Sequence, residues 1–351
     1  MTTTPNTALV TGATGLLGNA VVRQLLDAGT EVTAVVRDAG RARALLPNHP
    51  ALRLVTGDIT DVAGFAHALQ GVDVIFHTAA YFREYYQPGS DLRLLHRTNV
   101  EAVGELMRSA VNAGVPALVH TSSIAVLGGG TPQNPGDEDT PNAVPDDRRN
   151  AYGASKIRAE ELIADFCARH PLRVPLILPG WMWGPGDAGP TSAGRLFLAL
   201  ARGEVKALPR AGNHLVDARD VAAACIAAAV RGTGGRRYIV AGAWHSLQEL
   251  VAGVVRATGA DRVPRELPAA AAMTAAAALE WQARLRGKPP VATRTGMRVL
   301  MEGTHRRVVS ARARSELDVV FRPLEQTLAD QAAWHRDRGQ LAAAVRDTET
   351  E

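Results

Sequence analysis

The sequence predicts an α/β protein with an N-terminal doubly wound parallel sheet and a smaller C-terminal lobe. Short apolar runs alternate with segments of helical apolar spacing as far as about residue 180. This is the pattern of strands that helices cover on both faces. A glycine-rich turn follows the first apolar run, and small or polar residues follow several later ones. Ligands collect at such carboxyl ends of parallel strands.

The composition is that of a large globular chain. Of its 351 residues, 46% are hydrophobic, which is enough for one large core or two interlocked ones. The net charge of +4 comes from interspersed Arg and Asp/Glu residues, so it does not indicate nucleic acid binding. Cys167 and Cys225 give no disulfide framework, and no Cys/His cluster has metal-ligand spacing. We find no signal sequence and no apolar run of membrane-spanning length, and we expect a cytoplasmic protein.

The first strand, turn and helix have the pattern of a dinucleotide-binding unit. An apolar run at 7–10 leads into Gly12-x-x-Gly15-x-x-Gly18, and helical apolar spacing follows to Leu26. Gly12 and Gly15 would let the backbone approach a pyrophosphate, and Gly18 would let the helix pack closely on the strand. The helix N-terminus would supply N–H groups and the positive end of a dipole.

The end of the second strand indicates which cofactor binds. Residues 31–36 form an apolar run that ends in Arg37 and Asp38, with Arg41 and Arg43 close behind. An acidic side chain at this end binds the ribose hydroxyl of NAD, whereas an Arg accommodates the 2′-phosphate of NADP. Since a guanidinium pairs bidentately with phosphate, we expect NADP, with Asp38 leaving NAD possible.

Polar and small residues follow the next three strands. Asp58 follows the third strand, and can accept from an adenine amino group or cap the helix that begins near Asp61. The fourth run, 72–80, ends in small residues and includes His77, which we expect to be packed and hydrogen-bonded rather than catalytic. A fifth strand ends near Thr121 and Ser123.

Tyr152 and Lys156 stand four residues apart in a predicted helix, so the phenol and the ammonium can point to the same place. A phenol has an ordinary pKa of about 10, and a neighbouring cation lowers it. A lowering of roughly three units requires about 4 kcal/mol, which Lys156 and a nicotinamide cation can supply together. The pair therefore predicts a general acid and base.

In this order, the segments around 11–18, 57–59, 77–80, 99–100, 121–123, 152–156, 179–187 and 216–222 resemble the extended short-chain dehydrogenase/reductases. The likeness covers roughly residues 7–240. Within that family, Val36-Arg37-Asp38 looks most like the NADPH-dependent dihydroflavonol-4-reductase and 3β-hydroxysteroid dehydrogenase-like branch.

The resemblance implies a role for each matched residue. Tyr152 would exchange a proton with the substrate, Ser123 would hydrogen-bond the reacting oxygen, and Lys156 would hold the nicotinamide ribose and lower the pKa of Tyr152. Asn99 would help to position Lys156. The cofactor contacts implied are Gly12, Thr14, Gly15, Leu16, Leu17, Arg37, Asp58, Ile59, Thr78, Ala79, Ala80, Asn99, Thr121, Tyr152, Lys156 and Pro179. The resemblance also implies a homodimer through helices near 92–113 and 152–169.

The candidate substrate contacts are apolar and aromatic. Tyr81 and Phe82 follow the fourth strand in an aromatic, charged loop. Leu178 and Trp181 stand where sugar-nucleotide enzymes of the family often carry polar residues, and Trp183 lies two residues further on. With Ser123 and Tyr152, they predict a hydrophobic ketone or aldehyde, or a flavonoid- or steroid-like ring, as substrate rather than a sugar diphosphate. Packing in the core is the alternative for both tryptophans.

We expect residues 1–180 to form the Rossmann-type NADP-binding domain, with a strand returning near 236–241. Residues 181–345 would form most of an interleaved substrate-binding lobe, in which the Ala-rich helix at 269–286 either packs or covers the pocket. The predicted activity is NADP(H)-dependent oxidation or reduction of a small molecule. The alternatives are a nucleotide-sugar epimerase or dehydratase with tightly bound NAD(P), and a non-catalytic NADP-sensing regulator.

Overall fold

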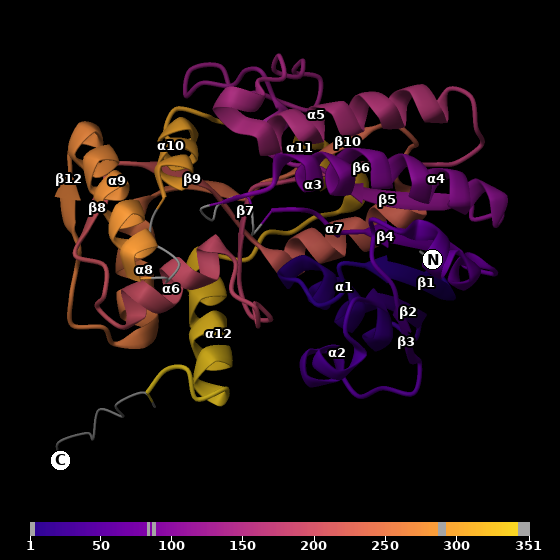
Figure 1. Cartoon of the computed structure of the whole chain (residues 1–351), viewed down its shortest axis with the longest axis horizontal. Coiled ribbons are helices and arrows are strands. Elements are labelled where there is room, and N and C mark those ends of the chain that lie inside the picture. Colours follow the sequence, from indigo (N-terminus) through magenta and orange to yellow (C-terminus); the bar gives the residue numbers. More distant parts are fainter. Residues whose placement is uncertain (1–3, 83–84, 86–88, 287–292, 343–351) are drawn as a thin grey trace.

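The computed structural model describes residues 4–82, 85, 89–286 and 293–342. Its centre is a seven-stranded sheet in the order β10-β6-β5-β4-β1-β2-β3, in which every neighbouring pair is parallel (Figure 1). The strands are β1 (Thr7–Thr11), β2 (Glu31–Val36), β3 (Leu52–Thr56), β4 (Val74–His77), β5 (Ala117–Thr121), β6 (Leu176–Pro179) and β10 (Arg237–Val240). The predicted doubly wound sheet and its returning strand are confirmed.

Helices cover both faces of this sheet (Figure 1). One face carries α1 (Leu16–Asp27), α7 (Ala218–Arg231) and α11 (Ala311–Leu317), and the other carries α4 (Ala102–Asn112), α5 (Asp147–Cys167) and the 3-10 helix η1 (Val62–Leu69). A short α2 (Ala39–Leu45) joins β2 to β3.

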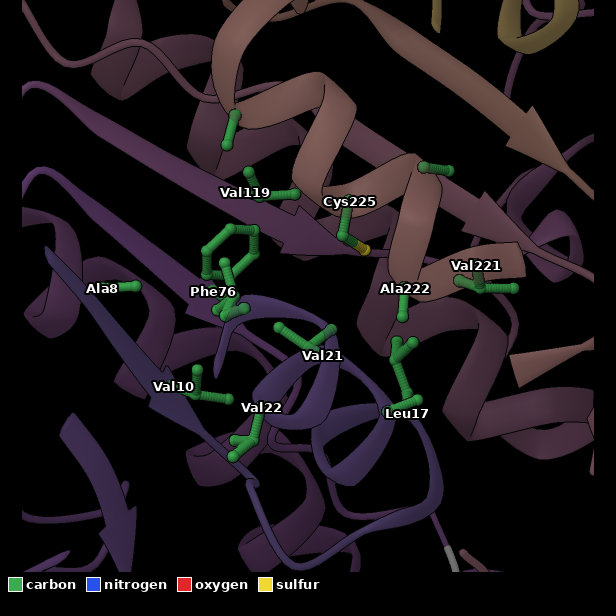
Figure 2. Packing of buried hydrophobic residues seen from close by; sticks show 14 of the residues in the cluster. Ala8, Val10, Leu17, Val21, Val22, Phe76, Val119, Val221, Ala222 and Cys225 are labelled. Carbon is green, nitrogen blue, oxygen red and sulfur yellow. The ribbon is translucent and has the colours of Figure 1, made fainter. Parts of the chain in front are cut away.

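The strands pack both layers because successive side chains point to opposite faces. In β4, Phe76 lies in the core with α1 and α7, whereas Ile75 lies in the core with η1 and α4. Figure 2 shows the first of these cores, with Phe76 and Val10 from the sheet against Val21 of α1 and the α7 residue Cys225. A parallel sheet buried on both faces explains the continuously apolar strands of the sequence.

The order of the strands determines where a ligand can bind. From β1 the chain continues to β2 and β3 on one side, and from β4 to β5 and β6 on the other. Helices on opposite sides therefore leave a crevice at the carboxyl ends of β1 and β4, which is where ligands bind in open α/β sheets.

The helix predicted from Leu92 to Ala113 is interrupted. It consists of α3 (Leu92–His96), a π-helical turn, η2 (Arg97–Glu101), and α4. Asn99 lies in the π-helical turn and is buried. Such turns are rare and occur frequently at functional sites.

The C-terminal lobe contains two small sheets. The first has the order β11-β9-β7 and the second pairs β12 with β8. These strands are β7 (Trp181–Trp183), β8 (Ala207–Pro209), β9 (Gly212–Asp217), β11 (Ala243–Ser246) and β12 (Arg265–Leu267); the helices are α6 (Ser192–Ala201), α8 (Leu247–Thr258), α9 (Ala269–Arg286), α10 (Arg294–Gly303) and α12 (Leu324–Asp337). A separate core around Trp183, Phe197 and Leu250 holds the lobe together.

The helix α8 of this lobe begins with a reciprocal cap. Ser246 and Glu249 form a capping box at the start of α8, in which each side chain accepts from the other residue's backbone N–H. Within the described part of the chain, no helix is both long enough and apolar enough to cross a bilayer.

Candidate active site

One cavity of about 850 Å³ runs from the glycine turn to the C-terminal lobe. It opens at the carboxyl ends of the parallel strands, as predicted. All the candidate catalytic, cofactor and substrate residues line this cavity except Asn99 and Trp183. The tertiary structure therefore brings together, on one cavity, candidate residues from seven separate segments of the sequence.

The glycine turn is compact for a steric reason. Gly12 has φ = +71°, and a β-carbon there would lie 2.6 Å from the backbone nitrogen of Ala79. A β-carbon on Gly18 would lie 2.2 Å from the carbonyl oxygen of Gly12. The expected close packing of helix on strand at Gly18 is therefore present. Gly12 is needed for two reasons: its positive φ forms the turn, and the lack of a side chain lets the segment after β4 approach its backbone.

Replacing Gly18 with Ala is expected to destabilise the protein by about 1–3 kcal/mol, because the added methyl group meets backbone that cannot move aside. Urea unfolding of the purified proteins measures the change. Gly234→Ala is the matched control, since its nearest neighbours lie at 3.4 Å or more and the residue is exposed. Equal stability of the two variants would show that the close approach at Gly18 is not important.

The start of α1 fits a dinucleotide pyrophosphate. Gly15 is the N-cap and no side chain caps this end. The first N–H groups of a helix have no partner within the helix, and Gly15, Leu16 and Leu17 line the cavity here together with Thr14. An anion is favoured at such a helix end.

The end of β2 presents basic side chains to the same cavity. Arg37 and Arg41 line it, whereas Arg43 does not. Asp38 also lines it, but its Oδ1 accepts a hydrogen bond from the backbone N–H of Arg41 at 3.0 Å and so caps α2. Asp38 therefore already has a structural partner.

Asp58 and Ile59 line the cavity beyond β3. The Oδ1 atom of Asp58 accepts from both the backbone N–H and the hydroxyl of Thr60, each at 2.8 Å. The cap of the following helix, η1, is Asp61, which accepts from Gly64 N–H. Asp61, and not Asp58, is therefore the cap of η1. Asp58 stabilises the turn before that helix.

Tyr152 lies at the cavity wall with its ring in an aromatic cluster. Phe82 contacts it edge-to-face with ring centroids 5.0 Å apart, and Tyr85 stacks at 6.3 Å. Only 8% of Tyr152 is exposed, and this burial raises the pKa of its phenol. Loss of solvation is the cause of this rise. The lowering expected from Lys156 together with a bound nicotinamide cation stays a prediction for the protein with its cofactor.

Lys156 is buried at the wall of the cavity. Its Nζ atom donates to the carbonyl oxygen of Thr121 at 2.7 Å and lies 6.0 Å from the centroid of the Tyr152 ring. Burial lowers the pKa of Lys156 to about 8, against a smaller opposing effect of Glu160. Lys156 is therefore largely protonated at neutral pH and uses one of its three donors within the protein.

Two histidines lie behind this lysine. His77 is fully buried and its Nδ1 is 2.8 Å from the Thr11 hydroxyl. Its ring stands 5.4 Å from that of His120. Burial and the charge of Lys156 lower the pKa of His77 to about 3, so it is neutral. His77 is packed and hydrogen-bonded, as the sequence predicted.

Ser122 and Ser123 have different partners. The hydroxyl of Ser122 donates to the buried carboxyl of Glu160. Ser123 accepts from the backbone N–H of Ala125 at 3.1 Å and lines the cavity. The Ser123 proton thus remains available to a ligand, which agrees with the choice of Ser123 over Ser122.

Asn99 does not line the cavity, but its side chain forms hydrogen bonds with two segments that do. Its side-chain oxygen accepts from the Tyr81 backbone N–H at 2.7 Å, and its amide nitrogen donates to the Ser155 hydroxyl at 3.0 Å. Asn99 therefore joins the segment after β4 to α5, next to Lys156 in sequence. No hydrogen bond joins it to Lys156 among the described residues.

The opposite wall is largely apolar. Tyr81, Phe82 and Trp181 line it as predicted, although residues 83–84 and 86 of the aromatic loop lie outside the described part of the chain. Trp183 requires a correction, because it is fully buried against the core of the lobe and is not among the lining residues. Its contact with Trp181, at 4.9 Å between ring centroids, supports the wall from behind.

Sequence reasoning missed the contribution of the C-terminal lobe. The cavity is also lined there by Met182, Arg195, Leu196, Leu208, Asn213, Thr293, Met297, Val299, Leu300, Glu302 and Arg306. No local motif distinguishes these residues in the sequence. The helix considered as a lid, α9, contributes none of its described residues to the wall, and α10 lies there instead.

The sheet, the uncapped glycine turn and the buried Tyr–Lys pair define an NAD(P)-dependent oxidoreductase of the short-chain dehydrogenase/reductase class, acting on CH–OH groups. Within that class, the chain belongs to the NAD dependent epimerase/dehydratase family, whose model matches residues 8–241. The family predicted from the motifs is thus confirmed.

Three similar proteins illustrate the range of this family. Sterol demethylase protein B of Methylococcus capsulatus is 32% identical and covers 95% of this chain and 100% of its own. A protein of Synechocystis sp., assigned provisionally as a dihydroflavonol 4-reductase, is 31% identical over 94% of each chain. The crystal structure of gox2253 superimposes with a TM-score of 0.79 at 32% identity, covering 96% of this chain and 100% of that one.

Proposed function

We propose that this protein is an NADP(H)-dependent reductase of ketones or aldehydes on mainly apolar substrates, and that it also oxidises the corresponding alcohols. The supporting observation is that one cavity is lined by the glycine turn, by Ser123, Tyr152 and Lys156, and by the apolar wall of the lobe. The test is the loss of absorbance of NADPH with a panel of apolar ketones and aldehydes. If the protein binds NADPH but consumes it with no member of the panel, the proposal fails.

Each polar residue of the site has a role in this proposal. A bound nicotinamide cofactor supplies hydride to the carbonyl carbon. Tyr152 gives its proton to the carbonyl oxygen, and Ser123, oriented by Ala125 N–H, donates a hydrogen bond to that oxygen. Lys156 has two remaining donors for the nicotinamide ribose, and its charge offsets part of the cost of ionising the buried phenol. Asn99 holds Tyr81 and α5 in place.

The preference for NADP rests on Arg37 and Arg41, which face the cavity, while Asp38 is used as a helix cap. Replacing Arg37 with Asp is expected to reduce kcat/KM for NADPH by about 10- to 100-fold, because a charge-assisted pairing with the 2′-phosphate is lost. The value for NADH should change by less. Steady-state kinetics with both cofactors measure this, with Arg43→Asp as the control. An unchanged ratio of the two kcat/KM values would remove Arg37 from the proposal.

The family also contains epimerases, and the same site suits a reaction in which the cofactor is reduced and reoxidised without release. That function predicts cofactor that copurifies with the protein and turnover without added NADPH. A regulator that only binds NADP predicts tight binding with no turnover. The cofactor content of the purified protein, followed by the substrate panel, distinguishes the three functions.

We also propose that the protein acts in the cytoplasm as a homodimer through α4 and α5. Size-exclusion chromatography with light scattering tests the dimer, and a monomer at micromolar concentration would contradict it.

A further inference from the structure

We propose that Arg306 binds a carboxylate of the substrate close to the reacting carbonyl, so that the substrates are 3-oxo acids and the corresponding 3-hydroxy acids with an apolar tail. This inference rests on the proposed reductase function and identifies its class of substrate. It depends on three features of the structure, namely a guanidinium in an apolar wall, a surplus of positive charge, and the position of that charge beside Ser123.

Arg306 belongs to the cavity wall. The residue is half-buried and lines the cavity beside Met297 and Leu300 of α10. Its burial lowers the pKa of the side chain from the ordinary value of an arginine, although a guanidinium stays charged throughout the physiological range. Burying a charge without a partner is costly, so this position calls for an anionic partner.

The hydrogen-bond partner of the Arg306 side chain is an uncharged carbonyl oxygen rather than a carboxylate. Its Nη1 donates to the carbonyl oxygen of Ile124 at 3.2 Å, and this is its one side-chain hydrogen bond among the described residues. Arg306 forms no ion pair with any residue of that part of the chain. The nearby carboxylate of Glu302 is paired with Arg149, whose Nε lies 2.9 Å from Oε1. Two guanidinium groups thus share one carboxylate, which leaves one positive charge at this wall.

The position of this charge relates it to the chemistry. Ile124 directly follows Ser123, and successive Cα atoms are about 3.8 Å apart. Arg306 therefore contacts the residue that directly follows Ser123, whose hydroxyl is proposed to hold the reacting oxygen. A carboxylate one carbon removed from the carbonyl can reach the guanidinium while the ketone oxygen meets Ser123 and Tyr152. The rest of the molecule then lies against the wall of Trp181, Leu196 and Leu208, which also line the cavity.

The reaction is balanced with the groups already named. The ketone carbon of the 3-oxo acid accepts hydride from NADPH, and its oxygen accepts the proton of Tyr152. The products are the 3-hydroxy acid and NADP⁺, and solvent returns the proton to Tyr152. The carboxylate takes no part in bond making, and its pairing with Arg306 determines orientation and selectivity.

The test compares 3-hydroxyoctanoate with its methyl ester, which differ mainly in charge. Binding is measured by calorimetry with saturating NADPH, where the alcohol is not consumed, and kcat/KM is measured with NADP⁺. We expect the wild-type protein to prefer the acid by roughly 10- to 100-fold in both quantities. In Arg306→Gln the two compounds should differ by less than about threefold, while Arg306→Lys should keep part of the preference.

Two controls determine whether the effect is specific. Arg148→Gln removes an exposed positive charge of the α5 N-terminal turn and should leave the preference unchanged. Arg195→Gln removes the other guanidinium of the lobe that lines the cavity. Loss of the preference in Arg195→Gln but not in Arg306→Gln would overturn the assignment to Arg306.

The outcomes separate this inference from the proposed function. If the wild-type protein binds acid and ester equally but reduces neutral ketones, the inference fails and the reductase function stands. If it binds the acid selectively through Arg306 without nicotinamide turnover, the anion site stands and the reductase function fails. The wild-type comparison requires no variant, so it remains decisive even if Arg306→Gln does not fold.

Discussion

Replacing Tyr152 with Phe is expected to lower turnover by about 10²- to 10⁴-fold, the usual contribution of a positioned general acid or base. The side chain keeps its ring, so the contacts with Phe82 and Tyr85 persist and the fold should be unchanged. The measurement is kcat with the best substrate of the panel, together with the Kd for NADPH, which should stay within about threefold of the wild-type value, since only one hydroxyl is removed.

Tyr85→Phe provides the matched control for this experiment. Tyr85 belongs to the same aromatic cluster, and its hydroxyl accepts from the backbone N–H of Ala151 at 3.1 Å. Its removal perturbs the same cluster without removing the proposed proton donor. Comparable activity of Tyr152→Phe and Tyr85→Phe would contradict the assignment of Tyr152 as the general acid.

Replacing Lys156 with Met is expected to abolish most activity and yet to stabilise the protein without cofactor at neutral pH. Burial lowers the pKa of Lys156 from 10.5 to about 8, so the unfolded chain binds more protons between these values and stability from this group rises with pH across that window. Below pH 8, burial of the protonated lysine lowers the free energy of unfolding by about 3 kcal/mol. At pH 10 it lowers this free energy by less than about 1 kcal/mol.

The bond from Lys156 to the Thr121 carbonyl oxygen opposes this gain, since its loss costs about 1–3 kcal/mol. We therefore expect Lys156→Met to be more stable than the wild-type protein by about 1–2 kcal/mol at pH 7, and no more stable than it at pH 10. Urea unfolding at the two pH values measures the difference. If Lys156→Met is less stable than the wild-type protein at pH 7, by at least as much as at pH 10, then the buried ammonium does not destabilise the wild-type protein.

Much of the fold followed from periodicity alone. The second strand was predicted at 31–36 and observed as Glu31–Val36, because a strand buried on both faces is continuously apolar and ends where polar residues begin. The fourth run was predicted at 72–80, but the strand is only Val74–His77. Thr78 closes the strand, because both its backbone N–H and its hydroxyl donate to the Thr11 carbonyl oxygen at the end of β1.

Three properties of the site depend on tertiary contacts that spacing along the chain does not report. The pKa of Tyr152 depends on how much solvent reaches the phenol, and spacing along a helix contains no information on that. Trp181 and Trp183 share a face of a short strand, yet only the first reaches the cavity, because the core of the lobe surrounds the second. Arg306 had no signal at all, since its significance comes from contact with Ile124, which lies 182 residues away.

Features encoded over a few neighbouring residues were therefore accessible in the sequence: the strand and helix periods, the glycine turn before α1, and the Tyr152–Lys156 spacing. Tertiary structure decided which side chains share a cavity, how deeply each is buried, and which charges have partners. These properties depend on contacts between distant segments and on the exclusion of water, which set the electrostatics of Lys156, Tyr152 and Arg306.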